Sequence, residues 1–165
     1  MRRHDVVIHE VDASRIDTIL ARLRTDSGAS ATLLIDRSGQ LLATGGHPSR
    51  FDTVSVAALA AGAFSSTGAM ARLLGQDGFT ALFHEGAEES LHVSAVDDET
   101  IVLAVFGKAT TPGMVRLFAR DAGTAIRGIL ARARQRPRRV GVLATPLEPA
   151  EIGAVLAPRP AEIAR

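Results

Sequence analysis

A lysine next to a glycine is the first pair of residues that suggests chemistry. Lys108 is the only lysine of the chain and follows Gly107, as the lysine of a phosphate-binding loop follows its last glycine. That motif also needs a glycine five positions before Gly107 and Ser or Thr after the lysine, but Val102 and Ala109 stand there. The pair therefore predicts a turn at the end of a strand and not a nucleotide site.

Ser65 is a candidate nucleophile because it lies between Gly62 and Gly68. A nucleophilic serine of the elbow type has a glycine two residues away on each side, at a turn from strand to helix. The glycines here are three residues away, and the segment around Ser65 predicts a helix. Since the chain also has no cysteine, thiol nucleophiles and disulfides are excluded. We expect no catalytic residue.

His84 and His92 could face one another across two predicted strands. A zinc site needs three or four ligands with supporting partners, and a third ligand is not evident. The alternative, two half-exposed histidines of a sheet, is favoured, so we expect no metal. The acidic residues cluster at predicted hairpin turns, where solvated charge is the default: Glu85, Glu88, Glu89, Asp97, Asp98 and Glu99.

Composition excludes several classes of partner. The 165 residues are 46% hydrophobic and carry a formal net charge of +1, with no tryptophan and no tyrosine. From Arg116 to Arg139 there are eight arginines and one acid, a net charge of +7, so the rest must carry −6. Phe118 alone interrupts these arginines, whereas nucleic-acid surfaces usually interleave aromatic residues. A solvated face is the simplest interpretation, and contact with an acidic protein is favoured over RNA.

Two stretches bear on the location of the protein. The apolar run at Val6, Val7 and Ile8 is too short for a secretory signal. The charge-free stretch 53–71 approaches the length of a membrane span but holds few large aliphatic residues. We therefore expect a cytoplasmic protein without membrane insertion.

The spacing of apolar and turn residues predicts an α+β domain over 10–136. Ile16, Ile19, Leu20 and Leu23 mark an amphipathic first helix, with Ser14 and Asp17 as its capping box. Five strands, mainly antiparallel, and two further helices follow in the order α-β-β-α-β-β-β-α. Their predicted ranges are 31–36, 41–44, 53–74, 79–85, 90–96, 101–106 and 112–136. Residues 137–165, with five prolines, predict a flexible arm with one short helical motif.

The second predicted helix has an unusual distribution of side chains. A helical wheel predicts a core face of Val56, Leu59, Ala63, Met70 and Leu74. The opposite side then holds Val54, Ala58, Ala61, Ser65, Gly68 and Ala69, with Arg72 below them. An exposed helix face normally carries charges. Small uncharged residues favour a partner-binding or dimerisation face, and a helix buried on both sides within its own domain is the alternative.

Several segments, in the same order, resemble the roadblock/dynein-light-chain family in its bacterial gliding-motility branch. They are the helical run from Asp52 to Gly62, Ala71-Arg-Leu-Leu-Gly75, Phe83-His-Glu-Gly86, Glu89-Ser-Leu-His-Val93 and the run from Thr111 to Leu117. The resemblance covers about residues 10–135, and several matched segments in order are more specific than any one of them.

The resemblance implies a homodimer and a protein partner. Two sheets would join edge to edge through the strand at 79–85, with Phe79, Ala81 and Phe83 at the interface and the second helices side by side. Two copies would bind one small Ras-like GTPase of the MglA type. The site residues implied for the GTPase are Ala61, Ser65, Gly68, Ala69 and Arg72, with Ile152 and Leu156 of the arm docking elsewhere on it.

The implied activity is stimulation of GTP hydrolysis without a catalytic residue from this chain. The chain would reposition the switch residues of the GTPase, and the nucleotide and Mg²⁺ would belong to that partner, so no cofactor is expected. Localisation at a cell pole would follow from partners. A scaffold or adaptor dimer that leaves hydrolysis unchanged is the main alternative, and a small-ligand sensor of similar outline is another.

Overall fold

Five antiparallel strands form one sheet with helices on both of its faces. The structure, a computed structural model, describes residues 9–46 and 51–135. The elements are α1 (Glu10–Ser27), β1 (Ala31–Asp36), β2 (Leu41–Gly45), α2 (Thr53–Leu73), β3 (Ala81–His84), β4 (Glu89–Ala95), β5 (Thr100–Gly107) and α3 (Pro112–Gln135). This is the predicted order and the predicted fold class.

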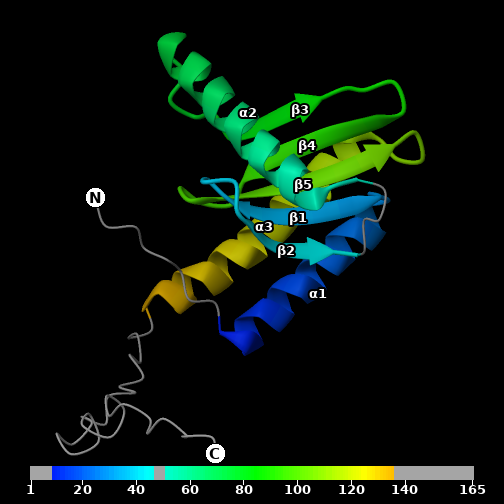
Figure 1. Cartoon of the computed structure of the whole chain (residues 1–165), viewed down its shortest axis with the longest axis vertical. Helices are drawn as coiled ribbons and strands as arrows, with labels where there is room; N and C mark the ends of the chain where they lie inside the picture. Colours follow the sequence, from blue (N-terminus) through cyan, green and yellow to red (C-terminus); the bar gives the residue numbers. More distant parts are fainter. Residues whose placement is uncertain (1–8, 47–50, 136–165) are drawn as a thin grey trace, which may run out of the picture.

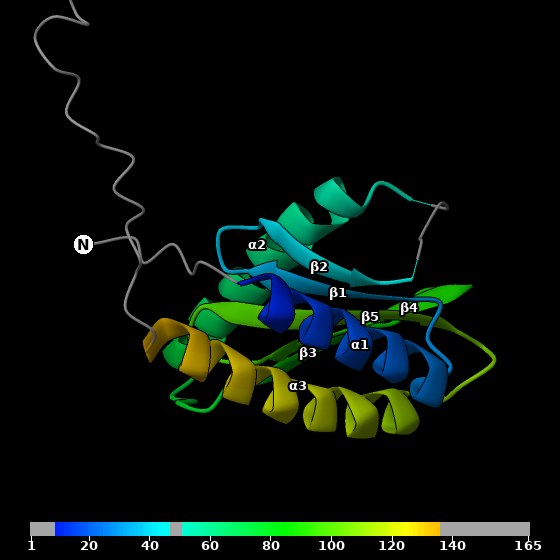
Figure 2. The same cartoon turned by 90° about the horizontal axis from the view of Figure 1, so that it is seen from below.

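The strands lie in the order β2-β1-β5-β4-β3, so β5 is central and β3 is an edge strand. Figures 1 and 2 show α1 and α3 side by side on one face of the sheet and α2 on the other. Residues 101–106 of β5 are buried on both faces, which explains why this run has no polar residue.

Each face of the sheet contributes its own hydrophobic core. Leu34 and Val102 pack with Leu20 of α1 and Ile126 of α3 on one side. Alternate residues of the same strands, Leu33, Ile35 and Leu103, point to the other side and pack under α2. The two-residue period of the strands thus separates the two cores.

Local signals in the sequence place the β1–β2 turn and the start of α2 correctly. Asp36 Oδ1 accepts hydrogen bonds from the backbone N–H groups of Ser38 and Gln40, at 2.9 and 2.8 Å. Gly39 has a φ of 92°, and a Cβ there would lie 2.9 Å from the Cα of Ala58. The β1–β2 turn therefore needs glycine at this position for two reasons, the positive φ and the close approach of α2. Asp52 caps α2 by accepting from the N–H of Val54 at 3.0 Å.

The first helix begins earlier than predicted. The carbonyl of His9 accepts from the N–H groups of Asp12 and Ala13, both at 2.9 Å, so α1 begins at Glu10. The predicted capping box at Ser14 is therefore wrong, and the Ser14 carbonyl instead accepts a hydrogen bond from the Thr18 hydroxyl within the helix. The acidic side chains of the first turn favour the earlier start because they interact with the helix dipole.

The predicted arm at 137–165, with Ile152 and Leu156, lies outside the described residues. Within them, α2 is long and apolar enough to cross a membrane by length and composition alone. Part of that helix nevertheless belongs to the core, because Ala57 and Phe64 are buried against the sheet.

Candidate functional site

The residues of α2 that face the sheet are small apart from one phenylalanine. They are Ala57, Ala60, Ala61, Phe64 and Gly68. The Phe64 ring lies 4.8 Å from the ring of Phe79, and a Cβ on Gly68 would lie 3.3 Å from Cδ1 of the same ring. The helix therefore lies close over a sheet whose own side chains supply most of the apolar volume.

Of the core face predicted for this helix, Val56 packs half-buried against the core, and the other four residues, Leu59, Ala63, Met70 and Leu74, are exposed. Leu59 is 73% exposed, Met70 56% and Leu74 78%. The prediction assigned the large aliphatic residues to the interior, but Leu33, Ile35 and Leu103 of the sheet fill that space. Small residues of α2 face them, and its leucines and methionine are left on the outside.

The residues predicted to bind a partner divide into two groups. Ala61 is 3% exposed and Gly68 is buried as well, so the predicted surface is corrected by removing these two. Ser65, Ala69 and Arg72 are exposed. Their spacing of four, three and seven residues puts them on one side of the helix.

The solvent side of α2 is uncharged along almost its whole length. Arg72 is the only charged residue from Thr53 to Leu73. Besides the small residues there are exposed large ones on this helix: Val54, Leu59, Met70 and Leu73. Contiguous apolar surface of this kind marks interaction sites in soluble proteins. The large exposed residues were missed because a helix that lacks charges on every side gives no periodic signal.

The predicted dimer strand is shorter than expected. β3 covers Ala81–His84, so Phe79 precedes the strand and packs half-buried against Phe64. Ala81 is half-buried. Phe83 is 44% exposed and stacks on Phe106 with ring centroids 6.1 Å apart. Of the three residues predicted for the interface, Ala81 and Phe83 lie on the edge strand.

The remaining candidates for chemistry stay apart in the structure. β3 pairs with β4 so that Phe83 is opposite His92, and His84 therefore points to the other face of the sheet from His92. No three metal-ligating side chains come together within residues 9–46 and 51–135. Lys108 Nζ lies 3.2 Å from Glu88 Oε1 in an exposed ion pair, as expected for a residue at a turn.

The sheet order and the helices define a Roadblock/LC7 domain. A model of this family matches residues 15–106, which is more than half of the chain, and the chain belongs to the Roadblock/LC7 family. The family comprises regulatory domains, and its fold is not a known catalytic one.

Within the family, the chain is similar to MglB proteins of known structure. MglB of Myxococcus xanthus is 32% identical with a TM-score of 0.71, covering 77% of this chain and 96% of that one. The gliding protein MglB of Thermus thermophilus is 28% identical with a TM-score of 0.73, covering 78% and 97%. A structure described as MglB with tetrameric arrangement is 28% identical with a TM-score of 0.74, covering 78% of this chain and 97% of that one. A comparison with curated protein sequences finds no match.

Proposed function

We propose that this chain is a homodimeric regulator of a small Ras-like GTPase of the MglA type, and that it stimulates GTP hydrolysis. The similarity to MglB supports a regulatory role connected with gliding proteins. The observation that carries the proposal is the exposed, almost uncharged side of α2, which a soluble domain would not keep without a partner.

The GTPase contacts one flank of α2, formed by the small residues Ser65 and Ala69 with Arg72 at its end. We call this the small-residue flank. Short side chains at Ser65 and Ala69 let the backbone of a switch loop approach the helix closely. Arg72, exposed at the end of this flank, provides a cation for an acidic or carbonyl group of the same loop.

Stimulation of GTP hydrolysis follows from the positioning of the switch loops of the GTPase. Catalysis of phosphoryl transfer depends mainly on orienting the attacking water and stabilising charge around the γ-phosphate. A surface that holds the switch loops in one arrangement raises the rate with the GTPase's own residues. This chain contributes no catalytic residue, and the nucleotide and Mg²⁺ remain those of the GTPase.

The second copy of the chain packs at the β3 edge. Figure 1 shows the C-terminal turns of α2 beside β3, where Met70, Leu73 and Leu74 are exposed. An unpaired strand edge next to exposed apolar residues is suited to pairing with an identical edge. The two α2 helices then form one platform on which two copies hold one GTPase.

A single-turnover assay separates the regulator from the adaptor. The MglA-type GTPase of the same organism is loaded with GTP and mixed with excess wild-type chain, and phosphate release is followed over time. An activator raises the first-order rate of hydrolysis above the intrinsic rate of the GTPase. If the GTPase binds the chain and the rate stays at its intrinsic value, the adaptor function replaces the proposed one.

A further inference from the structure

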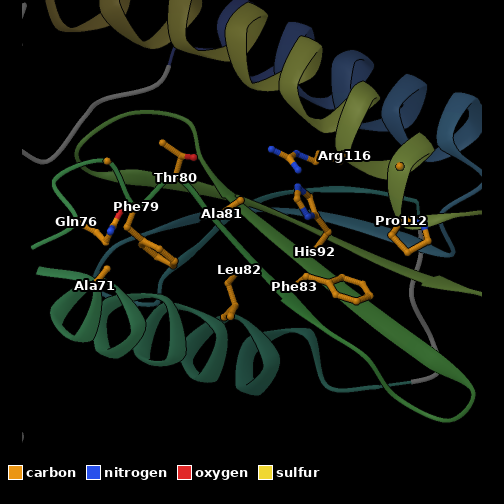
Figure 3. Close-up of a pocket in the computed structure, with 12 residues that line it drawn as sticks. Ala71, Gln76, Phe79, Thr80, Ala81, Leu82, Phe83, His92, Pro112 and Arg116 are labelled. Carbon is orange, nitrogen blue, oxygen red and sulfur yellow. The ribbon is translucent and has the colours of Figure 1, made fainter. Parts of the chain in front are cut away.

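A groove follows α3 and the β3 edge of the sheet and reaches Ala71 of α2 at one end. The proposed function does not use the wall that α3 forms. Two adjoining hollows of about 590 and 710 Å³ both include Thr80, Ala81, His92 and Arg116. Figure 3 shows Arg116 of α3 directly beside the imidazole of His92, with Phe83 and Pro112 at one end of the groove. Strands β3 and β4 form the floor and α3 forms one wall.

The wall carries arginines in helical register. Arg116, Arg120 and Arg127 all line the larger hollow, because spacings of four and seven residues put them on one side of α3. The floor between them and the sheet edge consists of small or polar side chains, among them Thr80 and Ser94. The groove is therefore cationic along the helix. Arg37 and the carboxylates of Asp77, Asp97 and Asp98 lie elsewhere in its lining.

The arginines differ in how far the fold already uses their charge. Arg127 donates from Nε to the carbonyl of Val96. Arg120 has only its exposed neighbour Asp121, at 3.6 Å, a pair that contributes little in water. Arg116 makes no hydrogen bond or ion pair with any residue in the described part of the chain. Its charge is available to a ligand.

His92 keeps the floor below Arg116 uncharged. Its side chain is 6% exposed. Burial lowers the pKa of His92 from its ordinary value, and the positive charge of Arg116 lowers it further. The neutral imidazole therefore leaves the guanidinium as the charged group at the centre of the groove, while Asp97 and Asp98 line the larger hollow. Asp97 is already paired with Arg134 at 2.8 Å.

We propose that this groove binds an extended acidic segment of a partner protein. Carboxylates of the segment pair with Arg116 and Arg120, and an apolar side chain packs on Pro112 at the start of α3. The arginines belong to α3, which covers the opposite face of the sheet from α2, so the site operates whether or not the chain activates a GTPase.

The dimensions and the charges favour a peptide over other anions. From Pro112 to Arg127 the wall is about 22 Å long at 1.5 Å per residue, which accommodates about six or seven extended residues. A small metabolite would need an enclosed pocket, and this groove is open along its length. Nucleic acid is disfavoured because the tyrosine and tryptophan side chains on which bases stack are absent from the sequence.

Fluorescence polarisation with an acidic peptide tests the site. The probe is a fluorescein-labelled octapeptide with the composition of six Glu and two Leu, titrated with full-length protein at low salt. The double variant Arg116→Glu/Arg120→Glu weakens binding by about tenfold or more, because it reverses two charges that contact the peptide. Arg22→Glu/Arg132→Glu is the matched control, since it changes the net charge by the same amount at two exposed arginines outside both hollows, and it changes the affinity by less than about twofold.

Equal weakening by the double variant and the control would show attraction to overall charge, and it would overturn the proposal. So would failure of the wild-type chain to bind the peptide, or equally strong binding of free inorganic phosphate that displaces it. The chain's own arm contains Glu148 and Glu151. If Glu148→Gln/Glu151→Gln increases peptide affinity about tenfold, the arm occupies the groove and the assignment to a partner fails.

His92 provides a local readout by nuclear magnetic resonance. A bound carboxylate offsets the charge of Arg116, so the pKa of His92 rises when the peptide is added. An unchanged His92 curve at saturating peptide would place binding elsewhere and contradict the proposal.

Discussion

Phe64 anchors α2 to the sheet, although the helix carries larger numbers of exposed aliphatic residues. It is 2% exposed, it packs against Phe79, and the guanidinium of Arg37 lies 5.6 Å from the centre of its ring. Leu59, one and a half turns earlier, is 73% exposed. The contribution of a side chain to stability here depends on its direction from the helix.

Phe64→Ala and Leu59→Ala form a matched pair on one helix. Phe64→Ala lowers the free energy of unfolding by about 3–5 kcal/mol, because it leaves a cavity under α2. Leu59→Ala changes it by less than about 0.5 kcal/mol, since the leucine is on the surface. Urea unfolding followed by circular dichroism, at low protein concentration, measures both. Equal losses would contradict the orientation of α2 described above.

Asp97 links the β4–β5 turn to the end of α3. Burial raises its pKa, but hydrogen bonds from Arg134 and from the N–H of Glu99 outweigh burial and hold the pKa below its ordinary value. The ionised form is thus favoured by folding. Its contribution to stability is complete above the unfolded-state pKa and is lost as the pH falls through the lower folded-state pKa.

Asp97→Asn tests this link. The variant loses about 1 kcal/mol of unfolding free energy at neutral pH, and its stability declines less than that of the wild type on acidification. Asp121→Asn serves as the control, because Asp121 is exposed and only 3.6 Å from an equally exposed Arg120. A parallel decline of Asp97→Asn and the wild type with pH would show that Asp97 is not stabilised in its ionised form.

Among the elements, α2 shows both the strength and the limit of prediction from the sequence. Its start at Asp52 and its end near Gly75 follow from local chemistry, a side-chain cap and a glycine with a φ of 75°. The buried side of α2 cannot be predicted in this way, because amphipathic periodicity needs a contrast between apolar and charged residues. Because α2 holds one charged residue, a helical wheel does not show which side faces solvent. Only the packing on the sheet distinguishes the buried Ala61 from the exposed Ser65.

The groove beside α3 illustrates what else the sequence leaves open. The run of arginines could be read directly, and contact with an acidic protein was one of its interpretations. The placement of Arg116 beside His92 could not be read from the sequence, because it depends on how far α3 lies from the edge of the sheet. The same holds for His84 and His92, since the pairing of Phe83 with His92 sends the histidines to opposite faces.

The dimer edge is tested at the level of elements. Met70→Glu combined with Phe83→Glu puts like charges at the end of α2 and on β3, where the second copy packs, and we expect the chain to become monomeric. Sedimentation velocity measures the change. Val11→Glu, at a residue of α1 that is 61% exposed, leaves the dimer intact. A double variant that sediments as the wild type would place the interface elsewhere.

The whole molecule offers separate surfaces on one small sheet. Figure 2 shows α2 on one face and α1 and α3 on the other. β3 is an edge strand, and the groove lies between this edge and α3. The net charge of +1 conceals this arrangement, because the arginines lie mainly on and after α3 and the side of α2 is almost uncharged. We therefore expect the proposed GTPase and the proposed acidic segment to bind on different helices, α2 and α3.

The arm adds a further expectation for the whole chain. We expect Ile152→Asp/Leu156→Asp to lower the affinity for the GTPase, because these apolar residues of the arm are proposed to dock on it. Isothermal titration calorimetry with the GTP-loaded GTPase measures the loss, with Ile163→Asp, nearer the end of the chain, as the control. Unchanged affinity in the double variant would make the arm a linker.

The most direct test of the central claim is single-turnover GTP hydrolysis with variants of the small-residue flank. Ser65→Arg and Ala69→Arg each put a long cation where a switch loop approaches, and both residues are exposed, so the thermal transition stays nearly unchanged. Ala125→Arg, at an exposed residue of α3 on the other side of the sheet, is the control. We predict that both α2 variants return hydrolysis to the intrinsic rate of the GTPase while Ala125→Arg stimulates it like the wild type. Full stimulation by Ser65→Arg and Ala69→Arg would contradict the account.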